Sequence, residues 1–244
     1  MKDDENEYWD RIADGYADEI MAIQPEFYHN SGALLDRELM PSWRVADIGN
    51  GGVINYGYRH LEKLDCIDLS PSATAAARYS GVPNVEFTQG NVFHLDGIDD
   101  GTYDAVILQC VIHHLAGDTF SATRDNTIRA LRECHRILRP GGKLLIVEST
   151  VSPWFEKIER ALYPLMQAFF KAIRFDAVYQ WSAPSLIELV GSLRMGEIRS
   201  SQPIEMGRWM WLLKKKVPNK ITPCGAVWIC LQKGQDRRAR PAAA

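Results

Sequence analysis

The stretch that decides the fold runs from Val45 to Gly52 and reads Val-Ala-Asp-Ile-Gly-Asn-Gly-Gly. A short apolar run ends in an acid and is followed directly by three glycines within four residues. This pattern is typical of a buried parallel strand that turns straight into a ligand-binding loop. Glycine can adopt positive φ and lets backbone N–H groups approach a ligand closely. We therefore expect Gly49 and Gly51 to form the floor of a binding turn.

A second acid follows at the spacing that nucleoside binding requires. Asp68 ends the apolar run from Leu64 and stands twenty-one positions after Asp47. An acid at the end of the second strand of an α/β nucleotide-binding fold contacts the ribose hydroxyls. Asp47 would repel the pyrophosphate of a dinucleotide, whereas it can attract the ammonium group of S-adenosylmethionine. The two acids therefore favour S-adenosylmethionine over a nicotinamide coenzyme, and Ile54 also stands where the dinucleotide fingerprint has a glycine.

At this point the sequence resembles the class I S-adenosylmethionine-dependent methyltransferases, especially the branch that modifies quinones, sterols, sugars and other small molecules. The resemblance covers roughly residues 8–150, and the phrase Leu138-Arg-Pro-Gly-Gly-Lys-Leu144 matches the family's helix-to-strand connection. It implies a Rossmann-like, doubly wound α/β sheet. We expect seven strands, mostly parallel with an antiparallel C-terminal strand, and helices on both faces.

The resemblance also assigns cofactor contacts. Tyr16 lies on an amphipathic helix expected over residues 8–23, which would close over the cofactor, and Leu69 would pack against the adenine. Asn91 stands where the family carries an acid that accepts a hydrogen bond from the adenine amino group. Its amide oxygen can accept the same bond without a charge, which weakens the contact by about 1 kcal/mol. The expected cofactor-binding residues are Tyr16, Asp47, Gly49, Asn50, Gly51, Asp68, Leu69, Asn91, Val92 and Gln109.

Two histidines follow the apolar strand expected at residues 103–108. The family often has His-Leu here, and His114 with Leu115 matches it. A neutral imidazole could accept the proton of an acceptor hydroxyl. We rank His114 first as a general base, His113 second and Glu148 third. The alternative is that one histidine orders the loop and the other is simply buried.

Composition limits the other function classes. The chain has 244 residues and a net charge of −3, which argues against a nucleic-acid binder, and the acidic N-terminus is not a signal peptide. Its five cysteines form no Cys-x-x-Cys pair, so we expect reduced thiols, no metal site and a cytoplasmic location. No apolar run reaches the length of a membrane span. We expect cap helices at about 7–40, a cofactor-binding core at 43–150, a helical insertion at 151–182, a further helix and strands at 183–233, and a tail at 234–244.

Local signals place several elements inside this layout. We expect a helix from Ser31 to Met40, a short helix after the glycine turn, and a helix that Ser70 caps and Pro71 begins. A later helix is expected from Asp125 to Leu138. The run Trp209–Leu213 before three lysines is a sixth strand, a pocket wall or a membrane-facing edge.

The segment 151–181 concentrates aromatic residues. Pro164 should kink or split a helix whose apolar positions repeat at helical spacing. Three interpretations remain open: a lid over an apolar or aromatic acceptor, a helix on a membrane or a second subunit, or an ordinary helix packed on the sheet edge. The aromatic residues are Trp154, Phe155, Tyr163, Phe169, Phe170, Phe175, Tyr179 and Trp181.

The resemblance implies methyl transfer to a small acceptor, an apolar or aromatic metabolite such as a natural product, with oxygen slightly favoured as the methylated atom. Three positions depart from the family pattern, because Val53 replaces a glycine, Asn50 replaces a small residue and Asn91 replaces the acid. The alternative function is therefore a protein of the same fold that binds S-adenosylmethionine or S-adenosylhomocysteine without transferring methyl. Such a protein would catalyse another rearrangement or act as a ligand-dependent partner.

Overall fold

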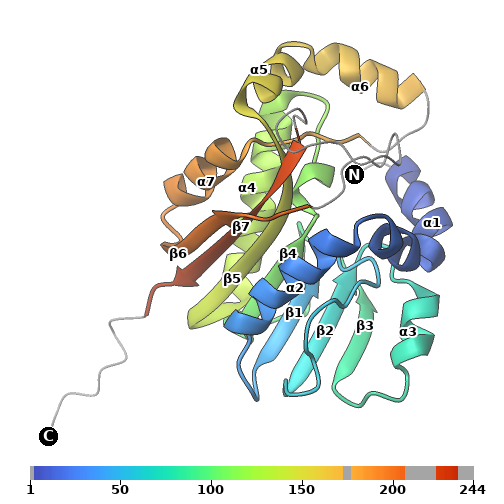
Figure 1. Ribbon diagram of the computed structural model, residues 1–244, viewed down its shortest axis with the longest axis vertical. Helices are drawn as coiled ribbons and strands as arrows, with labels where there is room; N and C mark the ends of the chain where they lie inside the picture. The colour runs from blue at the N-terminus through green and yellow to red at the C-terminus, as the bar shows by residue number, and fades with distance from the viewer. Residues whose placement is uncertain (1–2, 173–176, 207–223, 236–244) are drawn as a thin grey trace, which may run out of the picture.

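The computed structural model describes residues 3–172, 177–206 and 224–235, and these form one seven-stranded sheet in the order β3-β2-β1-β4-β5-β7-β6 (Figure 1). β7 runs antiparallel to β5 and β6, while the pairings among β1 to β5 are parallel. This confirms the predicted Rossmann-like sheet with an antiparallel C-terminal strand. The strands are β1 (Arg44–Ile48), β2 (Lys63–Asp68), β3 (Val85–Gln89), β4 (Tyr103–Gln109), β5 (Leu138–Val151), β6 (Gly196–Pro203) and β7 (Cys224–Lys233).

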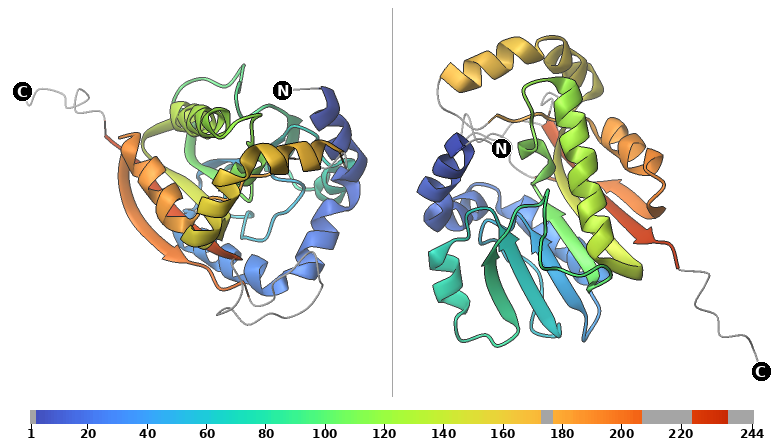
Figure 2. Two further views of the ribbon diagram at one scale, coloured as in Figure 1. Left: turned by 90° about the horizontal axis from the view of Figure 1, so that it is seen from above. Right: turned by 180° about the vertical axis from the view of Figure 1, so that it is seen from behind.

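Helices cover both faces of the sheet. α2 (Pro25–Glu38) packs with its residues Phe27 and Leu35 on one face, where they join Val45 and Ile107 of the strands. α4 (Phe120–Ile137) and α7 (Ala183–Ser192) cover the other face, as the view from behind shows (Figure 2). Because side chains alternate along a strand, each central strand supplies both cores. The remaining helices are α1 (Asp3–Ile23), α3 (Ala73–Tyr79), the 3-10 turn η1 (Ile112–His114), α5 (Pro153–Ala161) and α6 (Tyr163–Ala172).

The loop between β1 and β2 differs from the prediction, because residues 51–62 form turns and no helix. The Asn50 side chain donates to the carbonyl of Val53 at 2.8 Å, and the Val53 N–H donates to the carbonyl of Asn50 at 3.0 Å. These bonds close a local turn, and Asn55 then ties the loop to α2 through the carbonyl of Tyr28 at 2.6 Å. Val53, which replaces a glycine of the family pattern, is buried in the core beneath α2.

Other helix boundaries also differ from their prediction. α2 begins at Pro25 rather than Ser31, and α4 begins at Phe120, where the Thr119 hydroxyl accepts from the N–H of Ala122. α3 is capped by Ser72, whose hydroxyl accepts from the N–H of Ala75, so neither Ser70 nor Pro71 starts it. These caps decide the first turn because they satisfy N–H groups that have no partner inside the helix. The predicted run Trp209–Leu213 lies outside the described residues.

α1 lies alongside α3 and is held there by acids at four-residue spacing. Asp10 accepts from the Ser70 hydroxyl, Asp14 accepts from the N–H of Thr74 at 3.1 Å, and Asp18 forms an ion pair with Arg78 at 2.8 Å. Residues four apart share one helix face, so successive turns of α1 contact first the loop that carries Ser70 and then two successive turns of α3. The contacts fix α1 beside the open end of the sheet.

Candidate cofactor and acceptor cavity

A cavity of about 1150 Å³ lies at the carboxyl ends of β1 and β4. The strand order reverses between these two strands, since β2 and β3 continue on one side and β4 and β5 on the other. Open α/β sheets bind their ligands at such a reversal. Walls come from α1, the loops after β1 to β4, α4 and α6.

The glycine turn forms the floor of the cavity. Gly49 and Gly51 have φ of +68° and +57°, and a Cβ on Gly49 would come within 2.7 Å of a Val111 methyl group. A side chain at either position would be strained, so the turn depends on glycine. Asp68 connects this turn to β2, because its carboxylate accepts from the N–H of Gly51 at 2.8 Å and of Ser70 at 2.9 Å.

Asp47 lies beneath the cavity and does not line it. One of its oxygens accepts from the Tyr56 hydroxyl at 2.6 Å and from the Asn50 amide at 2.7 Å. Burial raises the pKa of Asp47 to about 7, while these two hydrogen bonds act in the opposite direction. Asp47 thus does not itself reach the cavity, but it holds the side chain of Asn50, which does line it.

Two amide oxygens on the cavity wall fit an ammonium group. Asn50 Oδ1 and Gln109 Oε1 are buried without a hydrogen-bond partner among the described residues. The amide nitrogen of Gln109 is fixed, because it donates to Asn55 Oδ1 at 3.0 Å. Buried acceptors rarely remain unsatisfied, so this pair calls for a donor from a ligand. The ammonium of S-adenosylmethionine supplies three N–H donors and a charge opposite to that of ionised Asp47.

The expected adenine contacts lie on the β2 and β3 side of the cavity, where Leu69, Asn91 and Val92 line the wall. Asn91 Oδ1 already accepts from the N–H of Phe93 at 3.0 Å. A carbonyl oxygen has two lone pairs, so it can accept a second bond from an adenine amino group. The Arg129 guanidinium lies 5.2 Å from the centre of the Phe93 ring and stabilises it on the wall.

The structure separates the two histidines. His114 lines the cavity, and its ring lies edge-on to Trp9 of α1 with centroids 4.8 Å apart. His113 does not line it; its Nδ1 pairs with Glu148 Oε1 at 2.6 Å. Glu148 is fully buried and also accepts from the N–H of Ile112 at 2.7 Å. His113 and Glu148 thus order the loop that carries His114.

The lid is one of the three interpretations of the segment 151–181, and the side chains of Phe169, Phe170 and Phe175 lie outside the described part of the structure. Tyr163, Tyr179 and Trp181 are buried in the core, whereas Trp154 is 60% exposed. α6 does form part of the cavity wall, but with Gln167 and Ala168. Among aromatic side chains of this segment that the structure describes, none lines the cavity. Pro164 splits the segment into α5 and α6, as predicted.

Several residues that line the cavity are not among those predicted from the sequence. Trp9 stands seven positions before Tyr16, two helical turns along the same face of α1, and this spacing was the available signal. Phe93 directly follows the predicted residues Asn91 and Val92, whereas Tyr28 comes from α2, which no sequence signal connects to the glycine turn. All the predicted cofactor residues except Asp47 line the cavity.

Comparison with known proteins agrees with this geometry. Residues 46–146 match the family model described as a methyltransferase domain. This region belongs to the class I S-adenosylmethionine-dependent methyltransferases. A curated ubiquinone biosynthesis O-methyltransferase from Xanthomonas oryzae pv. oryzae is 30% identical over 146 residues, which is 58% of this chain and 55% of that protein. The chain therefore spans about half the length of the curated relatives of this kind that it matches.

Solved structures of this methyltransferase fold cover more of the chain. The complex of the Haloferax volcanii Trm112 methyltransferase activator with a methyltransferase includes a chain that matches with a TM-score of 0.65 at 17% identity, covering 93% of this chain and 98% of the other. The 1,6-didemethyltoxoflavin-N1-methyltransferase of Burkholderia thailandensis, with bound substrate and S-adenosylhomocysteine, matches with a TM-score of 0.56 at 17% identity, covering 86% and 79%. At these identities the likeness concerns the fold.

Metal ligands, disulfides and membrane-spanning helices are three further features that the described residues allow to be assessed. Within the described residues, no group of three or more His, Cys, Asp or Glu side chains is arranged to hold a metal ion. None of the five cysteines, all of which lie in the described part of the chain, forms a disulfide bond. No helix in the described part of the chain has the length and apolar character needed to cross a membrane.

Proposed function

We propose that the protein is an S-adenosylmethionine-dependent methyltransferase that methylates a small metabolite, with an oxygen atom as the favoured acceptor. The observation that carries this proposal is a pair of buried, unsatisfied amide oxygens on the cavity wall: that of Asn50, whose amide nitrogen donates to Asp47 at the glycine turn, and that of Gln109 at the end of β4. Two acceptors backed by a carboxylate are complementary to an ammonium and unfavourable for a phosphate.

The residues of the chain would hold the donor at several points. Asn50 and Gln109 would accept from its ammonium, Asp68 from its ribose, and Asn91 from its adenine. When bound, S-adenosylmethionine supplies an electrophilic methyl group on a positively charged sulfur. Trp9 and Tyr16 of α1 line the same cavity and would exclude water from it. Accurate placement in a poorly hydrated site accounts for much of the rate of such a displacement.

The cavity wall outside these contacts supports a small acceptor with an apolar body and polar substituents. Val111, Leu115 and Ala122 are apolar, whereas His114, Asn126 and Gln167 offer hydrogen bonds. The side-chain nitrogen of Gln167 is buried without a partner among the described residues, which suits an acceptor oxygen. His114 would accept the proton of a hydroxyl as the new bond to oxygen forms.

The experiment is calorimetric titration with S-adenosylmethionine, S-adenosylhomocysteine and NADH, followed by incubation with a panel of hydroxylated aromatic and lipid-like compounds. We expect the first two ligands to bind and at least one hydroxylated compound to yield S-adenosylhomocysteine. Binding of NADH alone would overturn the proposal. Binding of S-adenosylmethionine with no product from any compound of the panel would favour the non-transferring alternative instead.

A further inference from the structure

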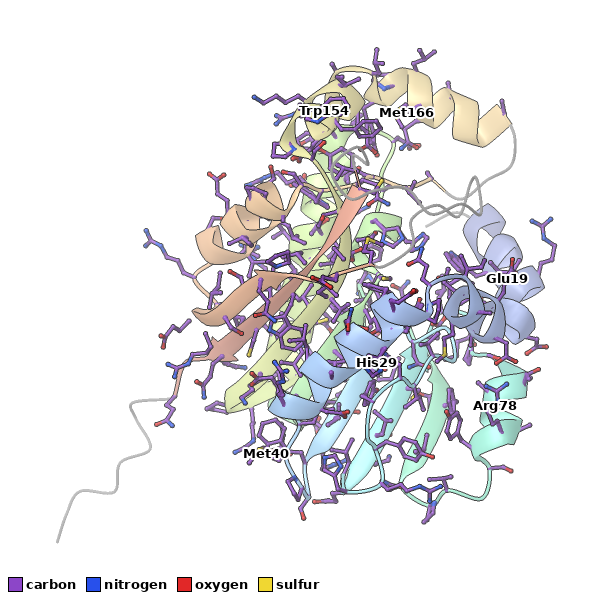
Figure 3. All side chains as sticks on the ribbon, viewed as in Figure 1. Glu19, His29, Met40, Arg78, Trp154 and Met166 are labelled. Carbon is purple, nitrogen blue, oxygen red and sulfur yellow. The ribbon has the colours of Figure 1, made fainter. Side chains whose placement is uncertain are left out.

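The outer side of α5 and α6 carries an exposed apolar stripe, defined here as Trp154, Ile158, Leu162 and Leu165. These side chains are 60%, 48%, 47% and 68% exposed. A spacing of four places Trp154, Ile158 and Leu162, the C-cap of α5, on one side of that helix, and Leu165 follows in the first turn of α6. Of the large apolar side chains that are exposed in the described part of the chain, only Met40 lies elsewhere. Figure 3 shows Trp154 and Met40 at opposite ends of the molecule. A cluster of this kind marks an interaction surface.

The exposed charges on α5 and α6 themselves have one sign. Lys157 and Arg160 are exposed, whereas Glu156 and Glu159 of the same helix are turned inward and are only 8% and 3% exposed. In α5 and α6, at the positions whose side chains the structure describes, every exposed charged residue is cationic. The exposed residues are Pro153, Trp154, Lys157, Ile158, Arg160, Ala161, Leu162, Pro164, Leu165, Ala168 and Ala172.

The inward orientation of the two acids is built into the fold. Glu156 accepts from the Tyr179 hydroxyl at 3.1 Å and from the Ser185 hydroxyl at 2.7 Å. Glu159 accepts from the N–H of Gln180 at 3.1 Å. The segment before α7 and the first turn of α7 therefore hold the acids of α5 in the interior. The face that α5 presents to solvent is apolar and positive, although the whole chain carries a net charge of −3.

We propose that this face docks on an anionic lipid surface. A tryptophan and aliphatic side chains flanked by Lys and Arg, without acids, are the combination by which a helix lies in the plane of a membrane interface. Negative headgroups complement Lys157, and Arg160, whose guanidinium lies 4.1 Å from the centre of the Phe120 ring, adds to the positive potential of this helix. The apolar stripe enters the boundary between headgroups and acyl chains. The proposal concerns this surface alone and holds whether or not the chain transfers methyl groups.

α6 lies between the apolar stripe and the cavity, because it contributes residues to both. Leu165 belongs to the apolar stripe, while Gln167 and Ala168 of the same helix line the cavity. Figures 1 and 2 show α5 and α6 at the edge of the molecule, beyond the end of the sheet where the cavity lies. A membrane bound by the stripe would therefore lie next to the cavity, on the other side of one helix.

The test is flotation of the full chain with phosphatidylcholine vesicles and with vesicles that also contain phosphatidylglycerol. We expect binding to the anionic vesicles that weakens with salt. The double substitution Leu162→Ser and Leu165→Ser should lower the partition coefficient by about tenfold or more, because two large apolar side chains no longer enter the lipid. Lys157→Glu should lower it by roughly fivefold or more. Met40→Ser is the matched control, an exposed apolar side chain outside the stripe, and should change nothing.

Absence of vesicle binding, or binding unaffected by the double substitution, would overturn the proposal. So would a dimer in lipid-free sedimentation that the same substitution dissociates, since the stripe would then face a second copy. Calorimetry with S-adenosylhomocysteine on each variant shows separately whether the cavity is intact. Both leucines are about half or more exposed, so we expect unchanged affinity there, and a failure of lipid binding is distinguishable from a failure of the proposed function.

Discussion

The carboxylate of Asp68 accepts hydrogen bonds from the backbone N–H of Gly51 at 2.8 Å and from that of Ser70 at 2.9 Å. One acid at the end of β2 therefore holds together the glycine turn after β1 and the loop before α3. Each carboxylate oxygen retains a lone pair for a further donor. Asp68 therefore shapes the floor of the cavity and also lines it.

The substitution Asp68→Ala should weaken binding of S-adenosylhomocysteine by roughly 1 to 3 kcal/mol, about fivefold to 150-fold in affinity, because it removes both the ribose acceptor and the bond to Gly51. Isothermal titration calorimetry measures this. Asp65→Asn is the control on the same strand, since Asp65 is buried, contacts the Tyr103 hydroxyl at 2.9 Å and does not line the cavity. Equal weakening in both variants would show a general loss of structure instead.

The substitution Asn91→Asp should strengthen binding of S-adenosylhomocysteine by about 1 kcal/mol, roughly fivefold in affinity, because a charged acceptor binds the adenine amino group more tightly. The bond from the Phe93 N–H at 3.0 Å can be kept, since an aspartate oxygen accepts it equally well. Titration with inosine-containing S-inosylhomocysteine, which lacks the amino group, serves as the control. A gain of the same size for both ligands would remove Asn91 from the adenine contact.

The substitution Gly49→Ala should destabilise the protein by about 2 kcal/mol or more and lower the melting temperature by about 4 to 8 °C. Gly49 has a φ of +68°, and its new Cβ would meet a Val111 methyl group at 2.7 Å. Thermal unfolding followed by circular dichroism measures the change. Gly81→Ala is the matched control, because no atom lies within 4 Å of a Cβ there. Similar melting temperatures for the two variants would contradict the role of the turn.

The substitution His114→Asn should leave the affinity for S-adenosylhomocysteine nearly unchanged and slow methylation of a hydroxyl acceptor by roughly a hundredfold or more. His114 lines the cavity, whereas His113 pairs with buried Glu148. The acceptor found in the panel provides the assay, and turnover measured across pH provides the readout. Unaltered turnover in His114→Asn would exclude this residue as the base.

The stability of the ligand-free protein should fall as pH rises from about 4 to about 7. Burial raises the pKa of Asp47 and of Glu159 to about 7, above their ordinary values of 3.8 and 4.5. The folded protein therefore keeps protons that the unfolded chain has released, and its free energy of unfolding decreases across that interval. Urea unfolding at a series of pH values measures the slope. Asp47→Asn should make the slope of the free energy of unfolding against pH less steep. Glu159→Gln, in α5, should reduce the same slope independently.

Identical slopes in the wild type and in Asp47→Asn would show that Asp47 ionises at its ordinary pKa. The same buried acid links pH to the ligand, because an ionised Asp47 favours an ammonium above it. S-Adenosylhomocysteine should therefore bind more weakly below about pH 7 in the wild type, and this dependence should be reduced in Asp47→Asn.

The sequence predicted the sheet because its signals are local. Each signal acts within a few residues: the alternation of apolar residues, the glycines at 49 to 52, and the Arg-Pro-Gly-Gly connection. These signals predicted the strands, and the family resemblance that they support implied the type of sheet. Helix starts were predicted less well. Thr119 caps α4 and Ser72 caps α3. Ser70 has the same capping chemistry as Ser72, but its hydroxyl donates to Asp10 of α1. The sequence alone does not reveal that contact.

By itself, the sequence determined the architecture, the glycine turn and the acid that ends β2, because each follows from backbone geometry and short-range patterning. The tertiary structure decided that Asp47 lies under the cavity, that His114 rather than His113 lines it, and that the acids of α5 point inward while its apolar side chains face solvent. Those outcomes depend on hydrogen bonds and burial between segments far apart in the chain, such as His113 with Glu148 and Glu156 with Ser185. No local pattern encodes them, because each side chain's environment exists only once the distant segment has packed against it.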